Sequence, residues 1–367
     1  MSPIRHLYVH IPFCPKVCPY CSFYKEASDR NKTRVFLDAL LLELERESAS
    51  RPIHPRTIFF GGGTPSALST SQLDYLLSGM RERLDLRDLT EWTLEMNPAT
   101  VSAEKAATLR ALGVNRISMG VQSWDPALLT VLGRVHTAAQ AERSYEILRE
   151  AGFQNVNLDL IFAVPTQTRE QWRASLEKTI ALAPDHISAY CLTYEEDTAF
   201  YRKFQNGEFT QDDDWDADLF EATIDLLGAS GYEQYEISNY ARPGRECLHN
   251  LAYWLGADYV GLGPSAFSTC GSRRWQNIAE TSEYSTRILR GESAISFTET
   301  IPSSTRRGEA IAFGLRTNRG VPLELLAPWQ EKVTEYLNEG FFSGDGERVR
   351  LTRKGKMVAD TLAETFV

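Results

Sequence analysis

The sequence of 367 residues has few cysteines and no long hydrophobic segment. Three of its six cysteines fall within eight residues, which is not the even spread expected of a disulfide framework in a secreted protein. Outside this cluster, Cys191 and Cys270 are expected to be small, buried and inert. The most apolar helical stretch, around 36–44, contains two acidic residues and is too short to cross a membrane. The N-terminus lacks a long apolar segment followed by a small-residue cleavage site, so a signal peptide is not expected. We therefore expect a cytoplasmic protein.

Positive charge is in the minority in this chain. Lys and Arg number 39 and Asp and Glu number 49, which makes the net charge −10. The long-range field of such a chain repels polyanions and argues against general binding to nucleic acid or anionic membranes. A local basic run lies between 348 and 356, but such a run is most often a solvated surface. The hydrophobic content of 43% and the charged content of 24% exclude intrinsic disorder.

Predicted strands and helices alternate through the first half of the chain. Strands that alternate with helices indicate a parallel sheet with crossover connections. Six such units are too few for a closed eight-stranded barrel, so we expect an open, partial (β/α)6 barrel of the TIM type in the α/β class. The predicted strands are 7–11, 57–60, 91–96, 116–122, 155–164 and 186–192, and the helices between them are 33–47, 71–84, 103–112, 138–151 and 169–182.

The pattern changes after about residue 200. A helix over 212–227 and a strand over 233–238 follow the barrel units. From about 300 two helices, over 304–315 and 323–337, a turn, a short strand and a last helix form a small module that resembles a winged helix. We therefore predict a core domain over 1–240, a connecting segment over 241–299 and a smaller, mainly helical C-terminal domain over 300–367.

The first chemical motif consists of Cys14, Cys18 and Cys21, spaced C-x₃-C-x₂-C. Prolines interleaved with these cysteines forbid a regular helix, so the segment is a loop that leaves the end of the first strand, where barrel enzymes place their sites. Structural zinc would want a fourth ligand, and the nearest histidines lie on the strand side. An iron–sulfur cubane held by three thiolates leaves one iron open for a small chelating ligand. Unligated thiols and zinc remain the alternatives.

With this motif the chain resembles the radical S-adenosylmethionine (SAM) superfamily, whose signature is C-x₃-C-x₂-C after the first barrel strand. The resemblance implies that Cys14, Cys18 and Cys21 hold a [4Fe–4S] cluster. It also implies that the open iron chelates the amino and carboxylate groups of SAM, and that reduction cleaves SAM to a 5′-deoxyadenosyl radical.

Polar residues at other strand ends support a SAM site. The glycine-rich turn 61–63 allows a ligand to approach the backbone closely, although a mere tight turn is the alternative. Glu95 could accept from an ammonium group, and Asp159 and Gln122 from ribose hydroxyls. Asp159 lies in an apolar run, where a carboxylate is costly unless it is hydrogen-bonded or faces a cavity. Arg134 could bind a carboxylate with two hydrogen bonds, unless it is a solvated helix charge.

Longer motifs narrow the resemblance to one radical SAM family, which comprises oxygen-independent coproporphyrinogen dehydrogenases (HemN) and haem chaperones (HemW). The motifs are HIPFCPKVCPYCSFYK, FFGGGTPS, EMNP, SMGVQSWD, a Gly-Arg pair and NLDLIFAVPTQT, and the resemblance covers nearly the whole chain. It implies that SAM contacts Tyr8, Gly62, Gly63, Thr64, Glu95, Gln122, Arg134 and Asp159.

Two departures separate this chain from the dehydrogenase branch. That branch carries a further cysteine two residues after the third, and this chain has Phe23 there. That branch also has a long extension before the first strand, whereas the first strand here begins at about residue 7. Both departures put decarboxylation of a porphyrinogen in doubt.

A second motif, H-N-x-x-Y-W, begins at His249 and resembles the haem-binding signature of the chaperone branch. A neutral imidazole is a good axial ligand for haem iron, and Tyr253 and Trp254 offer flat apolar faces. The alternative is a satisfied histidine beside core aromatic residues. Cys247 is a further candidate iron ligand, and without a C-x-x-C-H motif no c-type attachment is suggested.

These patterns predict a haem chaperone without catalytic residues of its own. It would bind haem and a SAM-coordinating cluster and transfer haem to acceptor proteins, which could include respiratory membrane proteins. The alternatives are a coproporphyrinogen III dehydrogenase and a nucleic-acid-binding protein that uses the C-terminal module. No nucleic-acid partner is expected, and a homodimer is compatible with the sequence without being required by any feature of it.

Overall fold

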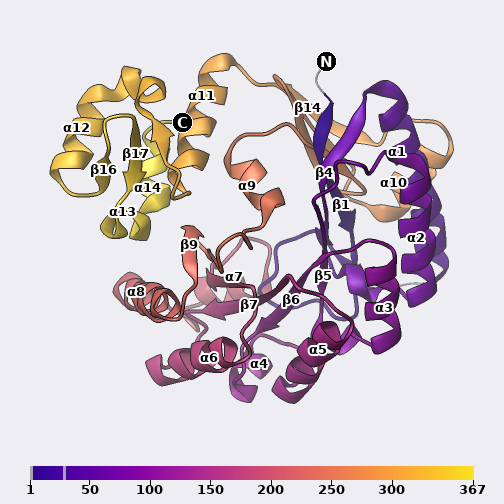
Figure 1. The fold of residues 1–367 in the computed structure, drawn as a ribbon, viewed down its shortest axis with the longest axis horizontal. Helices are drawn as coiled ribbons and strands as arrows, with labels where there is room; N and C mark the ends of the chain where they lie inside the picture. The colour runs from indigo at the N-terminus through magenta and orange to yellow at the C-terminus, as the bar shows by residue number, and fades with distance from the viewer. Residues whose placement is uncertain (1–2, 28–29) are drawn as a thin grey trace.

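A curved nine-stranded sheet organises the molecule, in a computed structural model that describes residues 3–27 and 30–367 (Figure 1). The strand order is β11-β1-β4-β5-β6-β7-β8-β10-β9. The six predicted strands are confirmed as a continuous parallel set: β1 (Ile4–Ile11), β4 (Ile53–Gly62), β5 (Glu91–Met96), β6 (Arg116–Gln122), β7 (Val156–Phe162) and β8 (His186–Cys191).

The two edges of the sheet are different. At one edge β11 (Val260–Leu262) lies parallel to β1. At the other edge β10 (Asn239–Ala241) and β9 (Glu233–Glu236) continue the sheet in antiparallel fashion beyond β8. No pairing joins β11 to β9 among the described residues, so the barrel is open, as predicted.

Helices cover the outer face of the sheet (Figure 1). The predicted helices are confirmed, and three of them begin with capping boxes at Ser69, Thr137 and Thr168, which satisfy the free backbone N–H groups of the first turn. The short helix α4 was not predicted; Asp125 caps it and a proline begins it. The helices are α1 (Arg30–Ser50), α2 (Thr70–Arg83), α3 (Ala103–Ala111), α4 (Pro126–Val131), α5 (Ala138–Glu150) and α6 (Arg169–Ala181).

The hydrophobic core lies between this outer helical layer and the sheet. Along each strand the side chains alternate, and the outward ones are large and apolar. Leu7, Phe60, Leu94, Ile117 and Leu158 are all fully buried in this layer. The inward side chains, such as Thr57 and Asn157, are largely polar, and they surround the interior of the barrel.

The segment 241–299 is ordered and joins the barrel. It supplies β11 to the large sheet and forms a second sheet from β12 (Phe267–Cys270), β13 (Arg273–Asn277) and β14 (Ile295–Thr300). Its helix α10 (Thr281–Leu289) packs beside α1 through the buried Glu43, which accepts from Tyr284 Oη at 2.6 Å and Asn277 Nδ2 at 2.6 Å. The division into 1–240, 241–299 and 300–367 stays a prediction.

The last part of the chain has a core of its own. The predicted helix over 323–337 is divided, because its first half contains Pro328 and forms the 3-10 helix η3 (Leu323–Trp329), after which α12 (Gln330–Asn338) begins. The basic run between 348 and 356 is partly paired, since Arg350 contacts Asp345 and Arg353 contacts Asp225 of α8. The elements are α11 (Ser303–Leu315), β15 (Val321–Pro322), η3 (Leu323–Trp329), α12 (Gln330–Asn338), β16 (Phe342–Gly344), β17 (Arg348–Leu351), α13 (Arg353–Met357) and α14 (Ala359–Glu364), preceded in the chain by α7 (Ala199–Gln205) and α8 (Asp213–Ala229).

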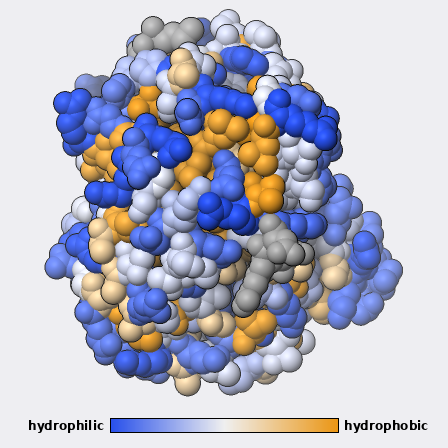
Figure 2. Space-filling model, turned by 90° about the vertical axis from the view of Figure 1, so that its right-hand side faces the viewer, coloured by the Kyte–Doolittle hydropathy of each residue, from blue (hydrophilic) through white to orange (hydrophobic). Residues whose placement is uncertain are grey.

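The outer surface is mixed in character. On the side where α1 and α10 lie, hydrophobic side chains form one area in the upper half among charged residues (Figure 2). Exposed hydrophobic side chains on these two helices include Val35 and Leu289. Within the described ranges, no helix combines the length and hydrophobicity needed to cross a membrane.

Candidate functional site

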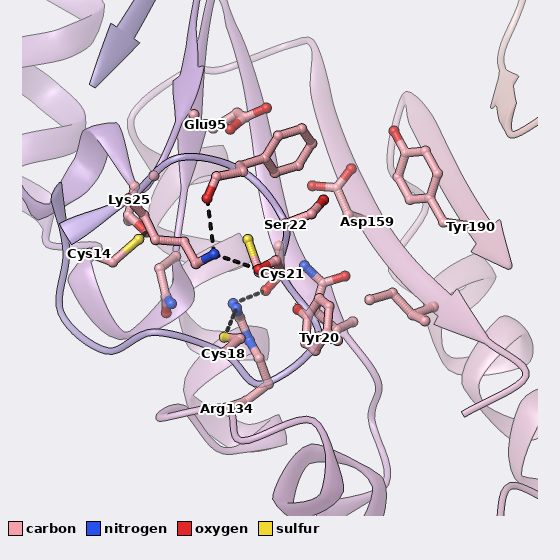
Figure 3. A pocket seen from close by; sticks show the side chains of 18 of the residues that line it. Cys14, Cys18, Tyr20, Cys21, Ser22, Lys25, Glu95, Arg134, Asp159 and Tyr190 are labelled. Atoms are coloured by element: carbon pink, nitrogen blue, oxygen red, sulfur yellow. Dashed lines mark hydrogen bonds between the residues drawn. The ribbon is translucent and has the colours of Figure 1, made fainter. Parts of the chain in front are cut away.

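The cysteine motif lies on a loop at the carboxyl end of β1. The loop is closed at its base by β2 (Phe13–Cys14), which pairs with β3 (Glu26–Ala27). Lys25 fixes its inner turn, since Nζ donates to the carbonyl oxygens of Cys21 at 2.5 Å and Phe23 at 2.9 Å (Figure 3). All three thiols are free of disulfides and are therefore available as ligands.

A pocket of about 420 Å³ lies at the carboxyl ends of the parallel strands. It brings together residues that are distant in the sequence, as expected where the ends of parallel strands converge. Ten of the eleven predicted site residues other than His249 line the pocket, and only Tyr8 is outside it. The predicted residues that line it are Cys14, Cys18, Cys21, Gly62, Gly63, Thr64, Glu95, Gln122, Arg134 and Asp159.

The three thiols fit an iron–sulfur cluster better than a single metal ion. Cys14 Sγ lies 3.3 Å from Thr64 Oγ1, and Cys18 Sγ accepts from Arg134 Nη1 at 3.4 Å. Among the described residues no three His, Cys, Asp or Glu side chains are close enough to share one metal ion. In a cubane each thiolate binds a different iron atom, so the sulfur atoms need only face one space. The charges of Lys25 and Arg134 would offset the negative charge of thiolates there.

The glycine turn after β4 is shaped by packing. Gly62 has φ +102°, and a Cβ there would lie 2.4 Å from the His10 ring. A Cβ on Gly63 would lie 2.7 Å from the Pro12 carbonyl group. Glycine is therefore required at both positions because a side chain would clash with residues of the cysteine loop and β1. The sequence had suggested a different reason, the close approach of a ligand.

The same turn can still offer hydrogen-bond acceptors to a ligand. The N–H groups of Gly63 and Thr64 donate to the carbonyl oxygens of Ile11 and Phe13, both at 2.8 Å. Carbonyl oxygens have two lone pairs, so those of the turn can accept from a ligand even where one is engaged. Such a turn suits an amino group better than a carboxylate or phosphate group.

Two carboxylates face the pocket from β5 and β7, the strands on either side of β6 (Figure 3). Burial, with the nearby charge of Asp159, raises the pKa of Glu95 to about 8. Asp159 accepts from Asn157 Nδ2 at 2.7 Å and from Ser118 Oγ at 3.2 Å, yet burial still raises its pKa. Asp159 is therefore both hydrogen-bonded and facing a cavity, the two conditions under which a carboxylate is tolerated in an apolar strand.

Gln122 and Arg134 are held in unusual positions. Gln122 has φ +68° at an irregularity in the pairing of β6 with β7, a conformation that is rare outside glycine. Arg134 is not a solvated helix charge: Nη2 donates to the carbonyl oxygen of Gly120 at 2.8 Å, and Nε is buried without a partner. That N–H group is a donor that a ligand in the pocket could use.

Tyr8 lies deeper in the barrel than the other predicted SAM contacts. Its hydroxyl group is 3.0 Å from His10 Nδ1, and its ring stacks on Phe59 with centroids 6.4 Å apart. Tyr8 lines a second cavity, of about 210 Å³, that adjoins the first. Tyr190 lines both cavities and was not predicted from the sequence. Inward alternation along β8 is the signal that could have revealed it.

Cys191 corrects an expectation from the sequence. An isolated cysteine on a predicted strand is most often a small buried hydrophobe. The structure instead places Cys191 at the carboxyl end of β8, exposed, in the lining of the pocket that holds the cysteine motif. Its side chain is therefore a fourth thiol at the mouth of the barrel.

His249 is buried and inaccessible to solvent in this structure. It lies on α9 (Leu248–Trp254), and Figure 1 shows this helix within the curve of the sheet. Nδ1 is 2.7 Å from Thr57 Oγ1, the ring stacks on Phe59 at 5.2 Å, and the residue is 1% exposed. Burial lowers the pKa of His249 to about 3, so the imidazole is neutral. Nε2 is buried and has no hydrogen-bond partner.

The helix that carries His249 is anchored at its start by Glu91. The Glu91 carboxylate accepts from the backbone N–H groups of Leu248 at 2.8 Å and His249 at 3.1 Å. Cys247 is fully buried beside the same carboxylate. Neither Cys247 nor His249 lines the pocket that contains the cysteine motif.

Comparison with known proteins gives consistent results. The model of the radical SAM superfamily matches residues 8–179. The heme chaperone HemW of Lactococcus lactis is 35% identical over 98% of this chain and 96% of its own length, and that of Bacillus subtilis is 33% identical over 99% of both. The structure of coproporphyrinogen III oxidase (HemN) from Escherichia coli superposes with a TM-score of 0.86 at 25% identity, covering 99% of this chain and 90% of that one.

Proposed function

The chain belongs to the HemW family of radical SAM proteins, and we propose on that basis that it is a haem chaperone that passes haem to acceptor proteins. The observation that carries the proposal is the similarity to HemW chaperones over nearly the full length of both chains. Phe23 adds to it, because a cysteine at this position is expected of the dehydrogenase branch.

The mouth of the barrel would hold the cluster and SAM. Cys14, Cys18 and Cys21 are the proposed thiolate ligands, and a reduced cluster would supply an electron to bound SAM. The carbonyl oxygens of the glycine turn and the Glu95 carboxylate would accept from the amino group of SAM. The other proposed contacts are Gln122 and Asp159 at the ribose, Arg134 at the carboxylate, and Tyr8.

The proposed haem ligand is Nε2 of His249. This atom is unpartnered, and the low pKa keeps the ring neutral, as iron ligation requires. Because the residue is buried between Thr57 and Phe59, haem could reach Nε2 only after α9 moves away from the barrel. The protein would therefore take up haem in a second conformation, in which Tyr253 and Trp254 are also free to contact the macrocycle.

Oxidation of coproporphyrinogen III is the second candidate function. The superposition with HemN over almost the whole chain favours it, since the same barrel and cluster loop are present. Phe23 opposes it. The dimeric state, the location in the cell and the acceptor proteins stay predictions.

The test is a titration of the anaerobically reconstituted protein with haemin, followed by visible absorption. We expect saturable, equimolar binding that is weakened at least about tenfold by His249→Ala, or about 1.4 kcal/mol. His54→Ala is the matched control, since His54 is a partly exposed histidine paired with Asp85. Absence of binding in the unsubstituted protein would overturn the chaperone proposal and lead to an assay of coproporphyrinogen turnover. Unchanged binding in His249→Ala would place the haem elsewhere.

A further inference from the structure

The interior of the barrel is polar, which sets it apart from barrels filled by branched apolar side chains. Ser118, Asn157 and Ser188 point inward from three adjacent strands and are joined by hydrogen bonds from Asn157 Nδ2 at 2.7 and 2.9 Å. Asn239 of β10 continues this network, accepting from Ser188 Oγ at 2.7 Å. A concave, polar interior of this kind suggests a ligand that hydrogen-bonds to it.

These side chains surround an inner chamber, the second cavity of about 210 Å³. The chamber adjoins the pocket of the cysteine motif, and Glu95, Asp159, Tyr190 and Phe23 line both. Phe23 therefore stands between the chamber and the barrel mouth, and 67% of its surface is exposed. The helix α9 contributes the amide of Asn250 to the chamber, while its neighbour His249 is buried against other residues.

Arg116 is the charged residue in the chamber that lacks a partner. It lies at the start of β6, is 2% exposed and lines the chamber. Its Nε is buried with no hydrogen-bond partner, and its guanidinium group forms no hydrogen bond to any residue of the described chain. A buried N–H group without an acceptor is costly even where nearby charges balance the guanidinium group, because it has lost its hydrogen bonds to water and has not replaced them.

The nearby carboxylates of Glu91 and Asp159 do not accept hydrogen bonds from Arg116. The Glu91 carboxylate accepts hydrogen bonds from the first N–H groups of α9 at both of its oxygen atoms. The Asp159 carboxylate accepts hydrogen bonds from the side chains of Asn157 and Ser118. Both carboxylates balance the charge of Arg116 from a distance, but neither occupies its five N–H groups.

We propose that the inner chamber binds a small carboxylate, with Arg116 as its charge partner and Asn250 as a second donor. The planar fork of a guanidinium group matches the two oxygen atoms of a carboxylate, and such paired hydrogen bonds are strong when water is excluded. The chamber is smaller than the roughly 300–1,000 Å³ of typical ligand pockets, so it admits a small acid and not a macrocycle.

The site would serve the radical chemistry of the fold and not haem ligation. Its occupant would lie next to Glu95 and Asp159, the proposed SAM contacts, and so beside the reacting end of that pocket. The proposal does not rest on haem binding: the chamber can bind a carboxylate whether or not His249 binds haem, and the two are measured separately.

The test uses the full chain labelled with ¹⁵N-arginine and observes the side-chain Nε–H signals during a titration with sodium acetate. Acetamide, the neutral analogue, is titrated at the same ionic strength. We expect one signal, identified by its absence in Arg116→Lys, to shift saturably with acetate and not with acetamide. No shift with acetate, or an equal shift with acetamide, would overturn the proposal.

A second variant keeps Arg116 in place. Asn250→Asp introduces a carboxylate at the chamber wall, so it should weaken the binding of acetate at least about tenfold. Asn206→Asp, at an exposed helix end, adds the same charge elsewhere and should leave the affinity unchanged. Equal affinity for acetate in Asn250→Asp and Asn206→Asp would place the anion outside the chamber and refute the assignment.

Discussion

Glu95 should make the folded protein less stable as the pH rises. Burial raises its pKa to about 8 in the folded chain, from an ordinary value of 4.5. Between these two values the folded state keeps a proton that the unfolded state has released. The unfolded state binds fewer protons, so the free energy of unfolding falls with rising pH by about 1.4 kcal/mol per pH unit from this group.

The substitution Glu95→Gln removes this dependence while keeping the shape of the side chain. From pH 5.5 to 7.5 the variant should gain about 2.7 kcal/mol relative to the unsubstituted protein, which is two pH units at about 1.36 kcal/mol each. The assay is urea-induced unfolding at a series of pH values, followed by tryptophan fluorescence. Glu82→Gln is the control, because the Glu82 side chain is 77% exposed and should show no such trend.

The reasoning would be refuted if the difference in free energy of unfolding between Glu95→Gln and the unsubstituted protein did not change across this pH range. Glu95 would then be solvated and ionised like an exposed carboxylate. Asp159→Asn gives a further check. The charge of Asp159 is the second cause of the raised pKa of Glu95, so the trend should end at a lower pH in that variant. If SAM binds as proposed, its amino group would meet an ionised Glu95 and offset this cost.

Three further predictions address the cluster and α9. Cys18→Ala should lower the iron and sulfide content after anaerobic reconstitution, whereas Cys191→Ala, at the same mouth, should not; equal loss in both would contradict the ligand assignment. Thr57→Val removes the partner of the buried His249 Nδ1 and should lower the free energy of unfolding by about 1–3 kcal/mol, as measured by urea unfolding. Burial lowers the pKa of His249 to about 3. Stability from this group is therefore intact above pH 6.5 and falls by about 1.4 kcal/mol per pH unit as the pH drops toward 3, a trend that His249→Phe should remove in acid unfolding.

Local patterns were enough to predict the barrel units and the cysteine loop. Each strand and helix of the barrel has a period that its own residues define, and the prolines of the cysteine motif forbid a helix whatever surrounds it. The predicted helix over 323–337 failed only in its first half, where Pro328 interrupts it. The sheet β12-β13-β14 was not predicted, because its strands are short and β14 pairs with β13 only across the intervening helix α10.

The positions of polar residues within the barrel depended on tertiary structure. Arg116 and Asn250 are ordinary polar residues in the sequence, and only the closing of distant strands around α9 places both in one chamber. The motif that begins at His249 was visible as residue types, but its burial follows from packing against Thr57 and Phe59 of β4. The sequence by itself determined which elements form and which residues carry side chains that can bind a ligand or react. The tertiary structure decided which of those residues share a cavity and which are hidden, because burial and charge depend on neighbours that the chain brings together only when it folds.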